Sequence, residues 1–315
     1  MSGPEITPAL ASQIGRTADG AAWLERLPGL VADARSRWGL SLGSPFTDGS
    51  AGWTAPGRTA DGEDVVVKIS FPHEEAVAEV DGLRIWSGRG GPELLDHHRE
   101  SWSLLLRRVR PGHVLEADHE LGQRRPEDRL EVASELLGRL HAAAPGSAEL
   151  PELADYTARL AGLLRERAGR HAASLEADPG LLAEAAHLLE VLPAERAGTV
   201  VHGDFNPGNL LAEDRDGRRG WVAIDPKPML GDPAYDPVPL IAQVADPFRE
   251  EDVTGLLRAR TAVVCGATGL DPARVAAWGL ARMVESALWL AEEVADRDGA
   301  LNQLREAREW SRLAV

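Results

Sequence analysis

The chain has 315 residues, of which 43% are hydrophobic, and its formal net charge is -16. This length and composition predict a globular protein with one large or two modest domains. The negative charge argues against nucleic acid and anionic membranes as partners, because most of the surface would repel a polyanion. It would favour cationic ligands, although acidity can also serve solubility alone.

Cysteine content and hydropathy bear on the compartment. Cys265 is the single cysteine, so no disulfide can form within the chain, and its apolar neighbours predict a small buried residue. The first twenty residues lack a basic segment followed by an apolar core, and no run approaches the ~20 apolar residues of a membrane span. We therefore expect a cytoplasmic protein.

The first third of the chain combines helical and strand patterns. Apolar residues recur at helical spacing over residues 23–38, which predicts an amphipathic helix. The β-branched run at 65–69 follows a turn-rich stretch and predicts a strand. Residues 73–88 are expected to form a helix with Val77 on its apolar face, and residues 101–112 a short strand that stops at Pro-Gly.

The rest of the chain is mainly helical in its pattern. Helices are expected at residues 127–143, 152–168, 180–192, 251–265, 271–297 and 301–313. The fold class is therefore α+β, with a small β-rich N-terminal lobe (residues 1–108) and a large helical C-terminal lobe (residues 109–315). The hinge is expected near 107–112.

Lysine is nearly absent from this sequence. Of the 34 lysine and arginine residues, only Lys68 and Lys227 are lysines. A lysine that survives where arginine supplies every other positive charge suggests a need for a compact ammonium group instead of a planar guanidinium. The alternative is that each lysine is retained by chance at a surface position. This alternative is stronger for Lys227, whose role the sequence leaves open.

The stretch "VVHGDFNPGNLL" at 200–211 holds two of the three asparagines in the chain. It contains His202, Asp204 and Asn209 in the pattern His-x-Asp-x-x-x-x-Asn, and its Gly and Pro residues predict a tight loop. Two leucines then begin a strand that returns through "EDRDGRRG" to Asp225. Such a hairpin would bring Asp225 beside Asn209, with the Asp204 carboxylate close by.

This set of groups suits phosphoryl transfer. Mg²⁺ prefers carboxylate and carbonyl oxygens, so Asn209 and Asp225 would be sufficient protein ligands for a nucleotide-bound metal. Asp204 would orient an acceptor hydroxyl and accept its proton late in the reaction. His202 belongs to the same catalytic motif, where it is expected to brace the loop through hydrogen bonds more than to bind metal.

These residues carry a resemblance to a known family. "VVHGDFNPGNLL" and "AIDPKPMLGDPAYD", together with "LGRLHA" at 137–142, resemble the aminoglycoside phosphotransferases, in the branch that includes streptomycin 6-phosphotransferases and hydroxyurea phosphotransferase. The resemblance spans roughly residues 68–236. It implies a bilobal protein-kinase-like fold and ATP-dependent phosphorylation of a hydroxyl group on a small molecule.

The resemblance also implies roles for single residues. Asp204 matches the catalytic aspartate, and Asn209 and Asp225 match the metal ligands. Lys68 matches the strand lysine that holds the nucleotide phosphates, and Glu79 is the best candidate for its partner on the following helix.

Other parts of the site are less sharply indicated. Glu75 is the rival of Glu79 as the partner of the lysine. The segment "DGSAGW" at 48–53, which contains Ser50, would cover the phosphates, although it lacks a full Gly-x-Gly-x-x-Gly and can also be an ordinary hairpin turn. The adenine is expected near backbone groups of Arg107 and Val109.

Two acids follow the expected metal site closely in sequence. Asp232 and Asp236 lie in "GDPAYDP", where they could face a cationic acceptor or hold the loop by capping. We count them as candidate substrate contacts together with Asp204.

The sequence therefore predicts ATP- and Mg²⁺-dependent phosphorylation of a small cationic acceptor, such as streptomycin or a related aminoglycoside. A metabolic kinase of an amino sugar and a hydroxyurea kinase are alternatives within the same chemistry. A catalytically silent kinase fold that binds a ligand or partner is disfavoured, because Lys68, Asp204, Asn209 and Asp225 are all present. The acceptor, the preference for ATP over GTP and the oligomeric state are not legible from the sequence.

Overall fold

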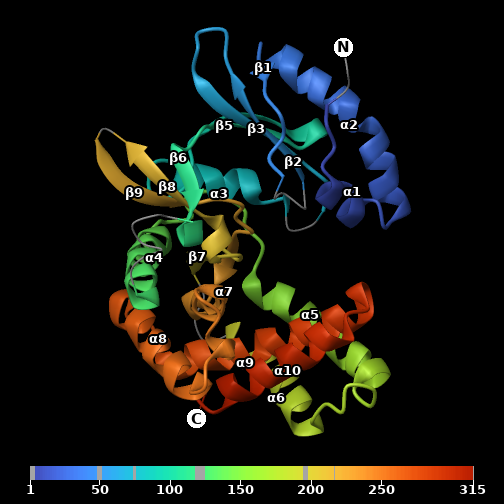
Figure 1. Ribbon diagram of the computed structural model, residues 1–315, viewed down its shortest axis with the longest axis vertical. Coiled ribbons are helices and arrows are strands. Elements are labelled where there is room, and N and C mark those ends of the chain that lie inside the picture. The colour runs from blue at the N-terminus through green and yellow to red at the C-terminus, as the bar shows by residue number, and fades with distance from the viewer. Residues whose placement is uncertain are drawn as a thin grey trace.

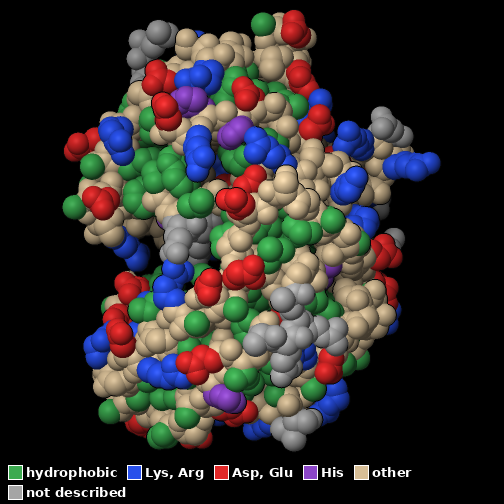
Figure 2. All heavy atoms as spheres, turned by 180° about the vertical axis from the view of Figure 1, so that it is seen from behind, with side chains coloured by type: hydrophobic (Ala, Val, Ile, Leu, Met, Phe, Trp, Pro, Cys, Tyr) green, Lys and Arg blue, Asp and Glu red, His purple; other side chains and the backbone are tan. Residues whose placement is uncertain are grey.

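The computed structural model describes residues 4–47, 52–73, 76–117, 125–193, 198–215 and 217–314. It has two lobes, a small one built around a sheet and a larger one built mainly of helices (Figure 1). Seen from behind, the molecule narrows between the lobes, and a notch opens at one edge (Figure 2). The expected α+β class with two lobes is confirmed.

The small lobe is a five-stranded antiparallel sheet in the order β1-β2-β3-β5-β4. Its strands are β1 (Ser41–Leu42), β2 (Gly52–Arg58), β3 (Asp64–Ser70), β4 (Leu94–His98) and β5 (Ser103–Arg107). Helices α1 (Pro8–Ile14) and α2 (Ala18–Arg37) lie beside the sheet and share its core. The strand expected at 65–69 and the helix expected at 23–38 are therefore confirmed.

Side chains alternate between the two faces of the sheet along β3, and this alternation determines the face on which Lys68 lies. Val65, Val67 and Ile69 are fully buried in the core shared with α2. Because successive side chains of a strand point to opposite faces, Lys68 lies on the other face, toward the large lobe.

Helix α3 (Glu79–Trp86) is shorter than the helix expected at 73–88. Val77 continues the apolar spacing, but it lies in a turn before the helix and is 56% exposed, so its place on the apolar face was wrong. Leu83 and Trp86 are buried as the pattern required. The prediction from apolar periodicity extended the helix into residues that form the preceding turn.

The large lobe contains seven α-helices within the described ranges: α4 (Pro126–His141), α5 (Leu153–His171), α6 (Pro179–Val191), α7 (Pro237–Gln243), α8 (Val253–Thr268), α9 (Pro272–Trp289) and α10 (Arg297–Ser311). The helix expected at 271–297 divides, because a π-turn at 290–294 ends in Ala295 with φ +58°. Cys265 is buried, as expected. None of the described helices is long and apolar enough to cross a membrane.

Two small antiparallel sheets complete the large lobe. One contains β6 (Pro111–Val114), β8 (Leu210–Arg215) and β9 (Arg218–Ala223), and the other pairs β7 (Thr199–Val201) with β10 (Met229–Gly231). The prediction of one strand that continues as far as Pro111 was wrong, because β5 ends at Arg107 and a separate strand, β6, begins at Pro111. The link between these two strands joins the lobes, and the boundary expected after residue 108 falls within it.

Candidate active site

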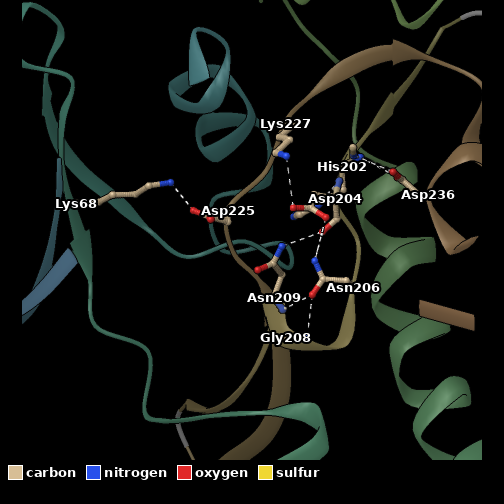
Figure 3. Close-up of polar contacts among 10 residues, drawn as sticks. Lys68, His202, Asp204, Asn206, Gly208, Asn209, Asp225, Lys227 and Asp236 are labelled. Carbon is tan, nitrogen blue, oxygen red and sulfur yellow. Dashed lines mark hydrogen bonds and ion pairs between the residues drawn. The ribbon is translucent and has the colours of Figure 1, made fainter. Parts of the chain in front are cut away.

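The loop at residues 202–209, here called the Asp204 loop, connects β7 to the hairpin of β8 and β9. The hairpin pairs Leu210 with Ala223, and the backbone N–H of Ile224 donates to the carbonyl of Asn209 at 2.9 Å. The expectation that a hairpin brings Asn209 next to Asp225 is therefore confirmed. Figure 3 shows the two residues on neighbouring segments, with the loop beside them.

Asp204 is held from two sides in this loop. The Asn206 side chain donates to Asp204 Oδ1 at 2.9 Å and accepts from the backbone N–H groups of Gly208 and Asn209. The ammonium of Lys227 lies 3.7 Å from Asp204 Oδ2 (Figure 3). Asn206 was not singled out as a site residue, although the scarcity of asparagine pointed to it. The carboxylate is oriented but remains partly exposed to solvent.

His202 is the first residue of the loop, and its side chain is completely buried. Its ring stacks on Trp86 of α3, its Nδ1 accepts from the Asp204 N–H at 3.4 Å, and burial lowers its pKa. A buried neutral ring cannot touch a substrate, so counting His202 among the catalytic residues was wrong. The geometry agrees with the alternative, in which His202 braces the loop.

Gly203 allows the Asp204 loop to pack closely on the chain that follows Asp225. Its φ is +83°, and a Cβ at this position would lie 2.2 Å from the carbonyl oxygen of Lys227. A Gly203→Ala change is therefore expected to lower the free energy of unfolding by about 2–4 kcal/mol, through backbone strain and displacement of the loop. Urea denaturation followed by circular dichroism measures the loss.

Gly146→Ala is the matched control for this change, because Gly146 has φ +62° but no atom within 4 Å of the added carbon. It should cost only the ~1–2 kcal/mol of left-handed strain. Equal losses in the two variants would contradict a close contact between Gly203 and Lys227.

Lys68 forms two ion pairs, one with Glu79 in the small lobe and one with Asp225 in the large lobe. Its ammonium donates to Glu79 Oε1 at 2.6 Å. It also donates to Asp225 Oδ1, the contact drawn in Figure 3. Burial works against the charged ammonium, but the two carboxylates outweigh it and raise the pKa of Lys68. Lys68 in turn lowers the pKa of Asp225, whereas burial raises the pKa of Glu79. Glu79 is thus the observed helix partner, and its rival Glu75 lies outside the described residues.

The expected metal ligands present suitable oxygen donors. The Asn209 amide nitrogen donates to the carbonyl of Asp204 at 2.9 Å, which leaves the amide oxygen directed away from that carbonyl (Figure 3). Asp225 has φ +59°, a conformation that aspartate tolerates better than most residues. A carboxylate and an amide oxygen fit Mg²⁺ chemically. Among the described residues, no group of three or more His, Cys, Asp or Glu forms a larger metal cluster.

A cavity of about 330 Å³ lies between the lobes next to Lys68. Its lining includes Glu79, Asn209 and Asp225, and at its other end the link residues Arg107, Arg108 and Val109. These positions are where the sequence placed the phosphates, the metal and the adenine. Ser50, expected over the phosphates, lies outside the described residues.

Two further cavities, of about 310 and 550 Å³, open on the other side of Asp204. Both are lined by Asp204, Tyr156 of α5, Tyr235 and Arg282 of α9, and the second continues to Asp246, Glu285 and Glu306. The Arg282 guanidinium lies 4.0 Å from the centre of the Tyr235 ring and donates to the Tyr235 carbonyl. Asp204 therefore lines these two cavities, whereas Asn209 and Asp225 line the cavity between the lobes.

The sequence matches a family model described as "Aminoglycoside/hydroxyurea antibiotic resistance kinase" over residues 37–294. The chain belongs to this family. It is 34% identical over 295 residues to a streptomycin 6-kinase of Streptomyces glaucescens, with 92% of each chain covered. It is 35% identical over 280 residues to a hydroxyurea phosphotransferase of Kitasatospora aureofaciens, with 88% of this chain and 76% of the relative covered. Both relatives are kinases of small molecules.

Solved structures confirm the kinase fold of this aminoglycoside/hydroxyurea kinase. A choline kinase of Streptococcus pneumoniae is 14% identical and superposes with a TM-score of 0.61, covering 91% of this chain and 99% of that one. An aminoglycoside phosphotransferase of Streptomyces rimosus is 20% identical with a TM-score of 0.53, covering 83% and 98%. The resemblance inferred from the two central motifs is thus confirmed, and the protein is a small-molecule kinase.

The structure also corrects the assignment of two acids in this kinase. Asp232 and Asp236 were expected as substrate contacts, but both are fully buried. Asp232 accepts from Arg274 at 2.5 Å and from Trp278 at 2.8 Å. Asp236 accepts from His141 and from the backbone N–H groups at the start of the Asp204 loop, each at 2.8 Å. Asp232 also caps the turn at 233–235 by accepting from the Ala234 N–H at 3.0 Å. Asp236 holds the Asp204 loop, and neither acid lines the three cavities described above, which favours the structural alternative for both.

Four residues that line the acceptor side together with Asp204 were missed by sequence reasoning. Tyr156, Tyr235, Arg282 and Glu306 come from segments that are far apart along the chain. One signal could have found two of them, because the chain has only two tyrosines and both line these cavities.

Proposed function

We propose that this kinase transfers the γ-phosphoryl group of ATP, with Mg²⁺, to a hydroxyl of a small cationic acceptor, and that the acceptor is streptomycin or a close relative. Such phosphorylation would inactivate the antibiotic. Residues 1–108 would form the nucleotide-binding lobe and residues 109–315 would carry the acceptor site. The observation that carries the proposal is the position of Asp204, which lines the acceptor cavities next to the nucleotide cavity.

The nucleotide would lie along the cavity between the lobes. Backbone groups of Arg107 and Val109 would bond the edge of the adenine, and Lys68 would hold phosphate oxygens while Glu79 keeps its ammonium in place. Asn209 and Asp225 would hold Mg²⁺, which neutralises charge on the nucleotide phosphates when bound.

Asp204 would act on the acceptor hydroxyl. Its Oδ1 is fixed by the Asn206 side chain, so the carboxylate can align the hydroxyl and accept its proton as the bond to phosphorus forms. The acidic groups of the larger cavity, Asp246, Glu285 and Glu306, would attract guanidinium or ammonium groups of the acceptor. These three acids would therefore make the contacts with a cationic acceptor that the sequence analysis had assigned to Asp232 and Asp236.

The experiment is a direct assay with MgATP and streptomycin, in which ADP release is followed and NMR locates any added phosphate. Turnover should fall as salt rises, because attraction between exposed charges is screened over ~8–10 Å. Hydroxyurea is the second candidate acceptor, favoured by the 35% identity to the phosphotransferase of that name. Efficient, salt-insensitive turnover of hydroxyurea without phosphorylated streptomycin would reject the streptomycin assignment and retain the kinase mechanism.

Binding of a cationic acceptor should depend on pH through Glu306. Burial, together with the negative charge of Asp246, raises the pKa of Glu306 to about 7, while a hydrogen bond from Gln303 opposes the shift. Glu285, Arg282 and Asp204 line the same cavity. Because only the ionised carboxylate attracts a cation, streptomycin binding should weaken up to about tenfold from pH 8 to pH 6.

Titration calorimetry at pH 6, 7 and 8 measures this dependence without interference from the chemical step. The Glu306→Gln variant should bind streptomycin more weakly at pH 8, and its affinity should depend less on pH. The Glu309→Gln variant, changed on the same helix, should keep the pH dependence of the unmodified enzyme. The raised pKa of Glu306 has the opposite effect on folding, so its contribution to stability falls as pH rises through about 7. An unchanged profile in Glu306→Gln would remove this residue from the acceptor site.

A further inference from the structure

Both lysines of this arginine-rich chain lie at the same site. Lys68 is explained by its pairs with Glu79 and Asp225 in the nucleotide cavity. Lys227 lines the smaller acceptor cavity together with Asp204, and its ammonium lies 3.7 Å from Asp204 Oδ2. The ammonium of Lys68 thus points at Asp225, and that of Lys227 points at Asp204 (Figure 3).

The backbone of Lys227 is fixed more firmly than a surface lysine requires. Its N–H donates to the carbonyl of His202 at 2.8 Å, and its carbonyl is packed against Gly203. Pro226 and Pro228 on either side restrict the backbone further. The side chain of Lys227 thus projects from a backbone that is fixed against the Asp204 loop, which places its ammonium close to Asp204.

The charge balance of phosphoryl transfer explains why a cation is needed there. The acceptor oxygen at Asp204 must approach a phosphoryl group whose oxygens are negatively charged, and the Asp204 carboxylate adds a further negative charge beside it. A compact ammonium with three rotatable donors can contact both a carboxylate and a phosphoryl oxygen, whereas a planar guanidinium occupies more space.

We propose that Lys227 is a second catalytic cation that contacts the phosphoryl group while it is transferred. This inference rests on the proposed function. In the step, Asp204 takes the proton of the acceptor hydroxyl, the new O–P bond forms, and the bond between phosphorus and the bridging oxygen breaks with its electron pair left on ADP. Lys227 stays protonated throughout and forms no covalent bond.

The first test compares Lys227→Met and Lys227→Arg with the unmodified enzyme. Loss of a charge-stabilising donor typically costs 10²–10³ in rate, so kcat should fall by about 100-fold in Lys227→Met, while KM for ATP changes less than about threefold. Lys227→Arg should recover only a small part. Arg218→Met, which removes a positive charge from an exposed position on the hairpin of β8 and β9 that precedes Lys227, should keep normal kinetics.

The second test needs no acceptor. Aluminium fluoride with MgADP mimics the phosphoryl group in transfer, so Lys227→Met should bind MgADP normally but lose at least about tenfold in affinity for the fluoride complex. If Lys227→Met matches the unmodified enzyme in turnover and in both affinities, the proposal for Lys227 is overturned and the proposed function stands. If the unmodified protein transfers no phosphoryl group and aluminium fluoride does not tighten MgADP, both proposals fall.

Discussion

Asp204→Asn is expected to lower kcat by at least ~100-fold and to leave nucleotide affinity nearly unchanged. The amide has almost the same shape as the carboxylate, so it can keep the contact with Asn206 but cannot accept the proton of the acceptor hydroxyl. The nucleotide should bind normally, because Asp204 lies outside the lining of the cavity next to Lys68. Steady-state kinetics and a fluorescent-nucleotide titration measure the two quantities.

Two comparisons make this result specific. Asn206→Ala retains the Asp204 carboxylate and releases its Oδ1, so a smaller loss of about tenfold is expected from poorer alignment. Asp214→Asn removes an exposed carboxylate from β8 and should leave turnover unchanged. Near-normal turnover in a folded Asp204→Asn enzyme would exclude Asp204 as the group that accepts the proton.

The Asp204 loop could be predicted because its signals are local. Fixed spacing between His202 and Asn209, with Gly and Pro forcing the turn, decides which side chains share the loop. The second strand of the hairpin returns the chain to the loop, so Asp225 is expected beside Asn209. The hydrogen bond from the Ile224 N–H to the Asn209 carbonyl confirms this position. The two lobes followed from the change of apolar spacing, which is also a local property.

Burial of acids could not be predicted in the same way. Asp232 is neutralised by a residue 42 positions away, and Asp236 is bonded to a histidine 95 positions away. Spacing along the sequence shows that a carboxylate follows a strand. It does not show which hydrogen-bond donor from a distant part of the chain contacts that carboxylate in the folded protein. The acceptor cavities pose the same difficulty, because Tyr156 and Glu306 meet only after α5 and α10 have packed together with α9.

Lys68→Arg is expected to lose almost as much activity as Lys68→Met, with kcat lowered by roughly 100-fold or more in both. The Lys68 side chain is only 13% exposed and its ammonium lies between Glu79 and Asp225, which leaves little space for a guanidinium. Arginine restores the charge but displaces one of the two carboxylates, so the phosphate oxygens lose a correctly placed donor. Steady-state kinetics over a range of ATP concentrations measures the effect.

A double variant separates catalysis from folding in this test. Lys68→Met leaves the buried Glu79 carboxylate without its cation, which destabilises the small lobe, and Glu79→Gln in the same chain removes that uncompensated charge. The double variant should regain thermal stability relative to Lys68→Met while its kcat stays low, because no cation then faces the phosphates. Recovery of activity together with stability, or normal turnover in Lys68→Arg, would show that the scarcity of lysine in this chain carries no information about the site.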